Sequence, residues 1–171
     1  FNSSSVFSAA FLSLAASVSS FSLWFKLIRA VVSACSSFFM MGLIWFVQLV
    51  HYPSFHKFDP SSFPDFHNDH VFRTGLVVVP VMLVELGSSV MLSFIESPVV
   101  FLNRTGLAIV AVIWLSTFLL QAPTHRKLQL GYDRAHIEKL VKTNWIRTVL
   151  WTAKALLSFF GYCYFLLKWG N

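Results

Sequence analysis

Residues 71–95 read VFRTGLVVVPVMLVELGSSVMLSFI, an apolar stretch that carries only two charged side chains, Arg73 and Glu85. A mainly apolar run of some 18 residues or more is long enough to cross the hydrocarbon core of a membrane as a helix. Three further runs of this kind lie at about residues 30–52, 105–122 and 146–167. The sequence therefore predicts an all-α fold, a bundle of four transmembrane helices.

The composition of the whole chain agrees with this class. Of its 171 residues, 56% are hydrophobic and 12% are charged, whereas a soluble domain carries about 25% charged residues. Four spans of roughly 20 residues leave no room for a separate soluble domain, so residues 28–171 are predicted to be one membrane domain. The chain has no Walker sequence and no G-x-S-x-G. Basic residues interleaved with exposed aromatics on a soluble surface are also absent, so nucleic acid is not an expected partner.

The N-terminal segment, residues 1–27, is rich in Ser and Phe. Its larger apolar residues recur at spacings of three and four, which predicts an amphipathic helix. These residues are Phe7, Phe11, Leu14, Val18, Phe21 and Phe25. We expect this helix to lie on the membrane surface or to pack against a partner subunit. Ser-rich, acid-poor leaders are typical of organelle targeting, which favours a thylakoid or mitochondrial inner membrane.

The polar residues lie at one end of each apolar run. In an up-down-up-down bundle, the ends of spans one and three and the starts of spans two and four lie on the same side. We call this side of the bundle the basic end. Its predicted site residues are Gln48, His51, His67, His70, Gln121, His125, Asn144 and Arg147. Most Lys and Arg residues lie there too, and such residues stay on the side of insertion, so we expect the basic end to face stroma or matrix.

The two halves of the chain also resemble each other. Gln48 and Gln121 close the first and third runs and are 73 residues apart, while Arg73 and Arg147, each followed by Thr, are 74 apart. Both halves would cross the membrane in the same direction. The pattern indicates a parallel two-fold internal repeat, with its polar elements facing one another at the basic end.

The four histidines of the basic end have several interpretations. Imidazole is a ligand for Zn, Cu, Fe and haem iron, and His67-x-x-His70 places two rings on one helical face. This spacing makes His67 and His70 candidate metal ligands, although no fixed metal motif is present. Pigment ligation, with chlorophyll as an example, and haem or lipid binding by the wider set of site residues are further hypotheses. The remaining interpretation is that the histidines cap helices and bind water at the membrane interface.

Glu85 is a candidate intramembrane acid. It follows Arg73 by 12 residues, which is about 18 Å along a helix and past the middle of a roughly 30 Å hydrocarbon core. A carboxyl group at this depth must be neutral, paired or next to a polar cavity. Lys154 is the nearest candidate partner by depth. A functional role for Glu85 and a role in holding the helices together both stay open.

Five blocks of the sequence resemble a known family. They are QLVHYPSF, FHNDHVFRT, VPVMLVE, LQAPTHRKLQLG and NWIRTVLWT, at residues 48–55, 66–74, 79–85, 120–131 and 144–152. Together they look like a little-characterised family of small four-span integral membrane proteins, mostly bacterial, similar in layout to the anthrone-oxygenase-like membrane proteins. The resemblance covers about residues 40–155 and implies the same four-helix architecture. It brings no agreed reaction or cofactor.

Three functions follow as hypotheses. The first is an accessory subunit of a large photosynthetic or respiratory complex, with other membrane subunits, lipids or pigments as partners. The alternative is a stand-alone metal- or haem-dependent membrane oxidoreductase, in which Glu85 handles protons and Arg147 holds an anionic substrate group. Its metal or haem ligands would be His51, His67, His70 and His125. The third is a small transporter or proton channel that uses Glu85.

Overall fold

The protein is an all-helical bundle without strands in the part that the computed structural model describes, residues 3–169, with side chains described from 24 to 168. The elements in chain order are α1 (Ser3–Phe46), η1 (Val47–His51), α2 (Tyr52–Ser54), η2 (Phe55–Lys57), α3 (Phe63–Ser93), α4 (Val100–Ser116), η3 (Thr117–Gln121), α5 (Ala122–Gln129) and α6 (Arg134–Trp169). The predicted fold class is confirmed.

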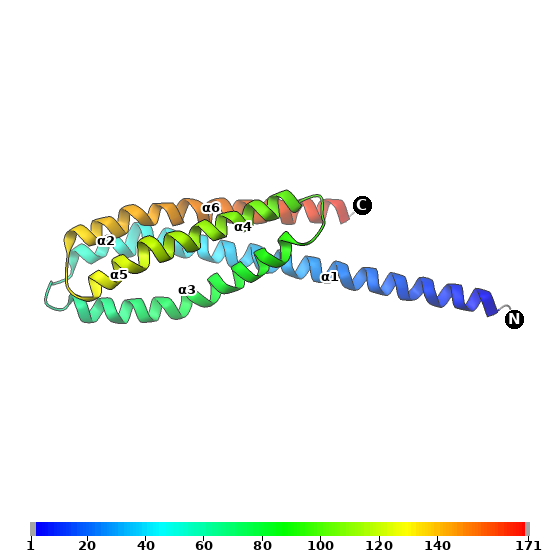
Figure 1. Ribbon diagram of the computed structural model, residues 1–171, viewed down its shortest axis with the longest axis horizontal. Helices are drawn as coiled ribbons and strands as arrows, with labels where there is room; N and C mark the ends of the chain where they lie inside the picture. The colour runs from blue at the N-terminus through cyan, green and yellow to red at the C-terminus, as the bar shows by residue number, and fades with distance from the viewer. Residues whose placement is uncertain (1–2, 170–171) are drawn as a thin grey trace.

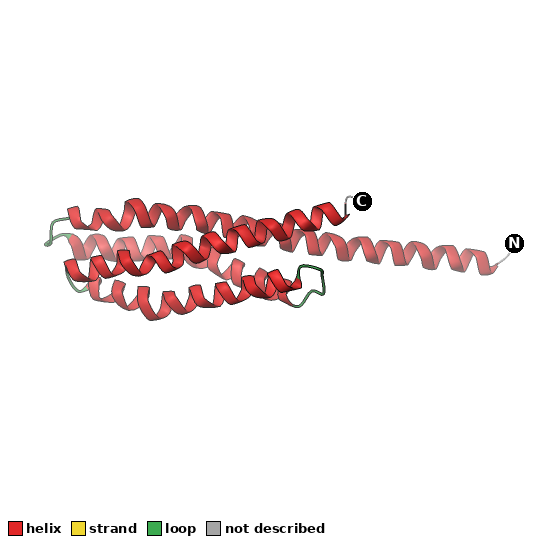
Figure 2. Cartoon of the chain, turned by 90° about the horizontal axis from the view of Figure 1, so that it is seen from above, coloured by secondary structure: helices red, strands yellow, loops and turns green. Residues whose placement is uncertain are grey.

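Four helical spans in the described residues are long and apolar enough to cross a membrane: Trp24–Lys57, Phe63–Ser93, Val100–Gln129 and Arg134–Lys168. They lie side by side in both views of the chain (Figures 1 and 2). Each is longer than the apolar run that predicted it, because the helix continues into the polar sequence at the basic end. The third predicted run, for example, ends at about residue 122, whereas the helical span continues to Gln129.

The basic end is the left end of Figure 1, where α2 and α5 lie next to the starts of α3 and α6. Only short connections join the spans there. Asp133 caps α6, since its Oδ1 accepts from the backbone N–H groups of Ala135 at 2.8 Å and His136 at 3.2 Å. The His136 ring, 2.6 Å from Oδ2, and these N–H groups hold the pKa of Asp133 below its ordinary value.

The first helix begins well before the membrane domain. Residues 3–23 form the start of α1 and continue without a break into the first span, so that α1 extends past the other helices on the right of Figure 1. The predicted apolar stripe of residues 1–27 falls mostly on side chains outside the described part of the chain. What the structure adds is that this segment and the first span are one helix.

The core is narrow and most of the helix surface faces outwards. Met40, Ile113 and Trp151 are fully buried where the four spans meet. In each span, however, at most 33% of the most apolar window is buried inside the bundle. Large apolar side chains such as Leu119 and Phe160 lie on the outside. Such an apolar surface suits contact with lipid chains, which offer no hydrogen-bonding groups.

Two short π-helices interrupt the spans at the basic end. They are η1 and η3, each of five residues, and each is followed by a short helix with proline as its second residue, Pro53 or Pro123. Proline lacks the N–H that an α-helix needs and its ring clashes with the carbonyl four residues earlier. A wider turn relieves both problems, and such turns are frequent at functional sites.

The π-helices give the repeat a different register from the one that the sequence predicts. They start at Val47 and Thr117, 70 residues apart, as are the two prolines. In this register Gln48 is the second residue of η1, whereas Gln121 is the last residue of η3. The two glutamines therefore do not occupy equivalent places, and the structure gives them different partners.

Candidate functional site

The basic end brings its four predicted histidines together as two imidazole pairs. His51 Nε2 lies 2.8 Å from His70 Nδ1, and His67 Nε2 lies 3.1 Å from His125 Nδ1. The rings come from three elements, η1, α3 and α5. The Thr74 hydroxyl also lies 3.0 Å from His70 Nδ1. The sequence thus located these histidines at one site, but it did not predict which rings pair.

Aromatic side chains surround the imidazoles. The His67 ring is fully buried and stacks on Phe63, with ring centroids 5.2 Å apart. Phe55 contacts the same ring edge-on and is also fully buried. On the other side, the Tyr52 hydroxyl lies 3.0 Å from His125 Nε2, so this tyrosine extends the row of polar groups. Within the pair of His67 and His125, His67 is therefore enclosed by aromatic rings, whereas His125 is only partly buried.

Among the described residues, no three His, Cys, Asp or Glu side chains are grouped so that they could hold a metal ion. His67 and His70, the predicted metal ligands, have ring centroids 5.7 Å apart, and each contacts a different imidazole. A neutral ring offers one N–H and one lone pair. One hydrogen bond joins the rings of each pair, while His67 Nδ1 has no hydrogen-bond partner among the described residues.

A second row of buried side chains holds Arg147. Gln48 Nε2 donates to the Val141 carbonyl at 3.2 Å, and its Oε1 accepts from Asn144 Nδ2 at 2.9 Å. Asn144 Oδ1 in turn accepts from Arg147 Nη1 at 3.4 Å. Thr148 adds a hydroxyl 3.4 Å from Gln48 Oε1. Three predicted site residues therefore act as one unit that links η1 to α6.

Arg147 is a buried cation that has no matching anion in the described part of the chain. Its side chain is 6% exposed and faces the Tyr52 hydroxyl. None of the salt bridges between described residues includes it, and its Nε has no hydrogen-bond partner there. A buried guanidinium that lacks an anion is costly, so this group is the strongest indication of a ligand at the basic end.

A cavity of about 310 Å³ adjoins these groups. Its polar lining consists of Tyr52, His70, Thr74, Thr117, Gln121, His125, Arg126, Gln129 and Arg147. Apolar side chains of α1 and α3, such as Leu43 and Val78, line the rest. No Asp or Glu is among the described residues that line it. Val79 and Arg126 are exposed, so the cavity reaches the outer surface between α3 and α5.

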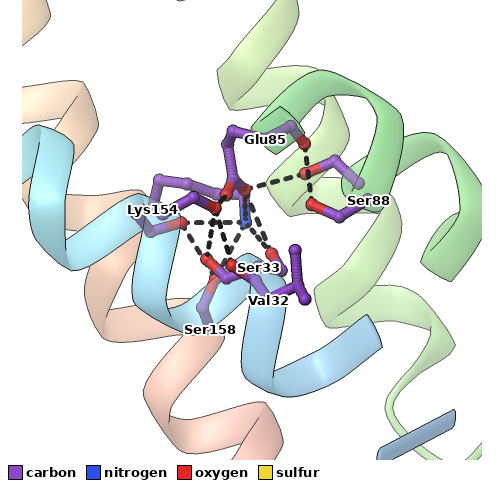
Figure 3. A network of polar contacts seen from close by, with 9 residues as sticks. Val32, Ser33, Glu85, Ser88, Lys154 and Ser158 are labelled. Carbon is purple, nitrogen blue, oxygen red and sulfur yellow. Dashed lines mark hydrogen bonds and ion pairs between the residues drawn. The ribbon is translucent and has the colours of Figure 1, made fainter. Parts of the chain in front are cut away.

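Deeper in the membrane, Glu85 forms an ion pair with Lys154, as its depth predicted. Glu85 Oε1 lies 2.6 Å from Lys154 Nζ, and the two side chains are 0% and 5% exposed. Figure 3 shows both side chains pointing at each other between α3 and α6, with Ser33 and Ser158 beside them. Glu85 does not line the large cavity, since it follows His70 by 15 residues, about 22 Å along the helix.

Serine hydroxyls complete this ion pair. Ser33 and Ser89 donate to Glu85 Oε1 at 3.0 Å each, and Ser36 donates to Oε2. Lys154 Nζ donates to Ser158 at 2.8 Å and also contacts Ser33 at 3.1 Å. Both charges are therefore satisfied within the bundle. The pair connects α1, α3 and α6, which favours the structural role among the two roles that the sequence left open.

Several residues of both polar groups were missed in the sequence. Tyr52 stands next to His51 and four residues after Gln48, a spacing that places it on the same helical face as Gln48 and marks it as a candidate site residue. The serines at positions 33, 36 and 37 have the spacing of three and four that marks one face. Their signal was hidden by the high Ser content of the N-terminal region.

Comparison of the chain with protein-family models, with curated proteins and with solved structures gives no match. The resemblance to the four-span family stays a prediction.

Proposed function

We propose that the protein binds a largely apolar molecule with an anionic, oxygen-bearing head in the cavity at the basic end. The observation that carries this proposal is the buried, unpaired guanidinium of Arg147 at the wall of a cavity without acidic lining residues. A carboxylate or phosphate oxygen is the natural partner of a guanidinium. Its binding would remove the cost of an isolated buried charge.

The rest of the cavity supports an apolar body for the same molecule. Val78 and Leu43 line it away from the arginine, and Val79 is both a lining residue and exposed on the lipid-facing surface. A chain or ring could therefore enter sideways from the bilayer. Ligand cavities commonly measure about 300–1,000 Å³, so a volume near 310 Å³ suits a small head with part of a chain better than a large macrocycle.

This proposal narrows the cofactor hypotheses. The histidines pair with each other rather than converge on one point, which is less suited to a metal or haem iron than to hydrogen bonding with a ligand. His70, His125 and Tyr52 line the cavity and can orient oxygen atoms of the head. Membership of a photosynthetic or respiratory complex stays a prediction. Partner proteins and chromophores that purify with the native chain would test it.

Ligand binding can be measured on purified protein in lipid nanodiscs. We expect dodecanoate to bind and dodecylamine, which has the same chain with a cationic head, not to bind. Arg147→Gln should weaken dodecanoate binding by about 30-fold or more, because removing one partner of a buried charge pair costs about 2–5 kcal/mol and each 1.4 kcal/mol is tenfold. Arg126→Gln is the matched control.

Arg126 lines the same cavity, but it is exposed to solvent at its mouth. Its removal should change the affinity by about fivefold at most, since an exposed ion pair contributes only about 0–1 kcal/mol. Equal binding of the two dodecyl compounds would overturn the proposal. So would an Arg147→Gln variant that is folded and binds dodecanoate as tightly as the unaltered protein.

A further inference from the structure

The side-chain amide of Gln121 has only one orientation that agrees with its neighbours. The Thr143 hydroxyl donates its single hydrogen to the Lys139 carbonyl at 2.8 Å. It can therefore only accept from Gln121, whose Nε2 lies 3.0 Å away. This assignment turns the Gln121 carbonyl oxygen, Oε1, away from Thr143. Gln121 lines the cavity of the basic end and is 2% exposed.

Gln121 Oε1 is a buried acceptor that has no hydrogen-bond partner within the described part of the chain. Gln48 provides the comparison, because it is the same residue type at the same end of the bundle and is equally buried. Its Oε1 accepts from Asn144 Nδ2 at 2.9 Å and lies 3.4 Å from the Thr148 hydroxyl. The oxygen and nitrogen of the Gln48 amide are both hydrogen-bonded, whereas the oxygen of the Gln121 amide lacks a donor.

Two residues that line the cavity therefore each carry a buried polar atom without a partner among the described residues, one a donor and the other an acceptor. Arg147 has a charged donor, Nε, without an acceptor, and Gln121 has an acceptor without a donor. Buried polar groups in folded proteins are almost always hydrogen-bonded. A simple fatty acid at neutral pH would satisfy Arg147, but its carboxylate has no hydrogen to give to Gln121.

We infer that the head of the ligand carries a hydroxyl or N–H group beside its anionic oxygen, so that the anion meets Arg147 while the donor meets Gln121 Oε1. The chemical class is that of long-chain 2-hydroxy acids, N-acyl amino acids and acidic hydroxy-ketones. This inference rests on the proposed function, because it specifies the head of the molecule that the cavity binds. It assigns Gln121 as the residue that selects the head group.

The test compares two probes that differ by one hydroxyl group, 2-hydroxydodecanoate and dodecanoate, in the nanodisc assay. We expect the hydroxy acid to bind about tenfold more tightly, since one net hydrogen bond corresponds to about a tenfold change in affinity. Gln121→Met keeps the length of the side chain and should abolish the preference. Gln48→Met should retain it, because Gln48 does not line the cavity.

The outcomes separate the inference from the function on which it rests. Equal affinity of the unaltered protein for the two probes would overturn the inference and leave the binding function intact. Retention of the preference in Gln121→Met would do the same. Failure of both acids to bind would overturn the proposed function itself. The comparison in the unaltered protein needs no variant, so it decides the matter even where Gln121→Met does not fold.

Discussion

Replacing Glu85 by Gln should destabilise the bundle strongly, although the two side chains have almost the same shape. The substitution removes the carboxylate that lies 2.6 Å from Lys154 Nζ. The ammonium group then remains inside the bundle with a side-chain exposure of only 5%, and its remaining partners are neutral hydroxyls. An uncompensated charge is thereby created in the membrane interior.

The structure sets the size of this effect. Removal of one partner from a buried ion pair typically costs about 3–5 kcal/mol. Lys154 keeps its contacts with Ser33 and Ser158, so we expect the lower end, about 3 kcal/mol. In the double variant Glu85→Gln/Lys154→Met both charges are absent. Because neutral replacements of buried pairs are often harmless, its stability should return to within about 1 kcal/mol of the unaltered protein.

Equilibrium unfolding in mixed micelles of a mild detergent and sodium dodecyl sulfate, followed by circular dichroism, measures these differences. Glu96→Gln serves as the control, because Glu96 is exposed in the connection between α3 and α4, and its change should stay within about 0.5 kcal/mol. The reasoning is refuted if Glu85→Gln matches this control. It is equally refuted if the double variant is no more stable than the single one, since the two charges would then be uncoupled.

Two further predictions concern local packing and pH. Gly106→Ala should be at least about 1 kcal/mol less stable than Gly87→Ala in the same assay, because crowding in a packed core costs about 1–3 kcal/mol. The new methyl group at position 106 would lie 3.2 Å from Lys154 Cε, whereas a methyl group at position 87 would meet open space. Asp133→Ala should lower the melting temperature at pH 7. The lowered pKa of Asp133 means that its carboxylate stabilises the fold at pH values above the ordinary value of 3.8. The difference in melting temperature between the two proteins should therefore fade as the pH falls below that value. A difference that stays constant down to strong acid would contradict the capping role of Asp133.

The ion pair shows how much depth alone can predict. Glu85 and Lys154 were matched because each lies a known number of residues from the basic end, and a helix rises uniformly along the membrane normal. The rotation of each helix about its axis is not fixed by depth. Two serines of α1, Ser33 and Ser36, donate to Glu85. Their orientation depends on the packing of the helices, which a single sequence does not supply.

At the basic end too, the sequence predicted where the residues lie but not which of them contact each other. The common location of His51, His67, His70 and His125 followed from the up-down order of the spans. Their pairing did not follow, because η1 and η3 add a wider turn just where these residues leave the α-helical register. The prolines after each π-helix were visible in the sequence. A proline predicts that the α-helix is disrupted nearby, but not whether the result is a kink, a break or a π-helix. The empty acceptor of Gln121 depended on that detail.

The ion pair has a consequence for biogenesis. Each of spans two and four carries a charge deep in its apolar run, and a Lys or Asp at the centre of a helix disfavours insertion by about 2.5–3.5 kcal/mol. Span two is among the most apolar of the four and span four is the least apolar. The last helix therefore benefits most from the Glu85 carboxylate of span two, which is already in the membrane when span four inserts. Integration of the last helix should depend on the helices that leave the ribosome before it.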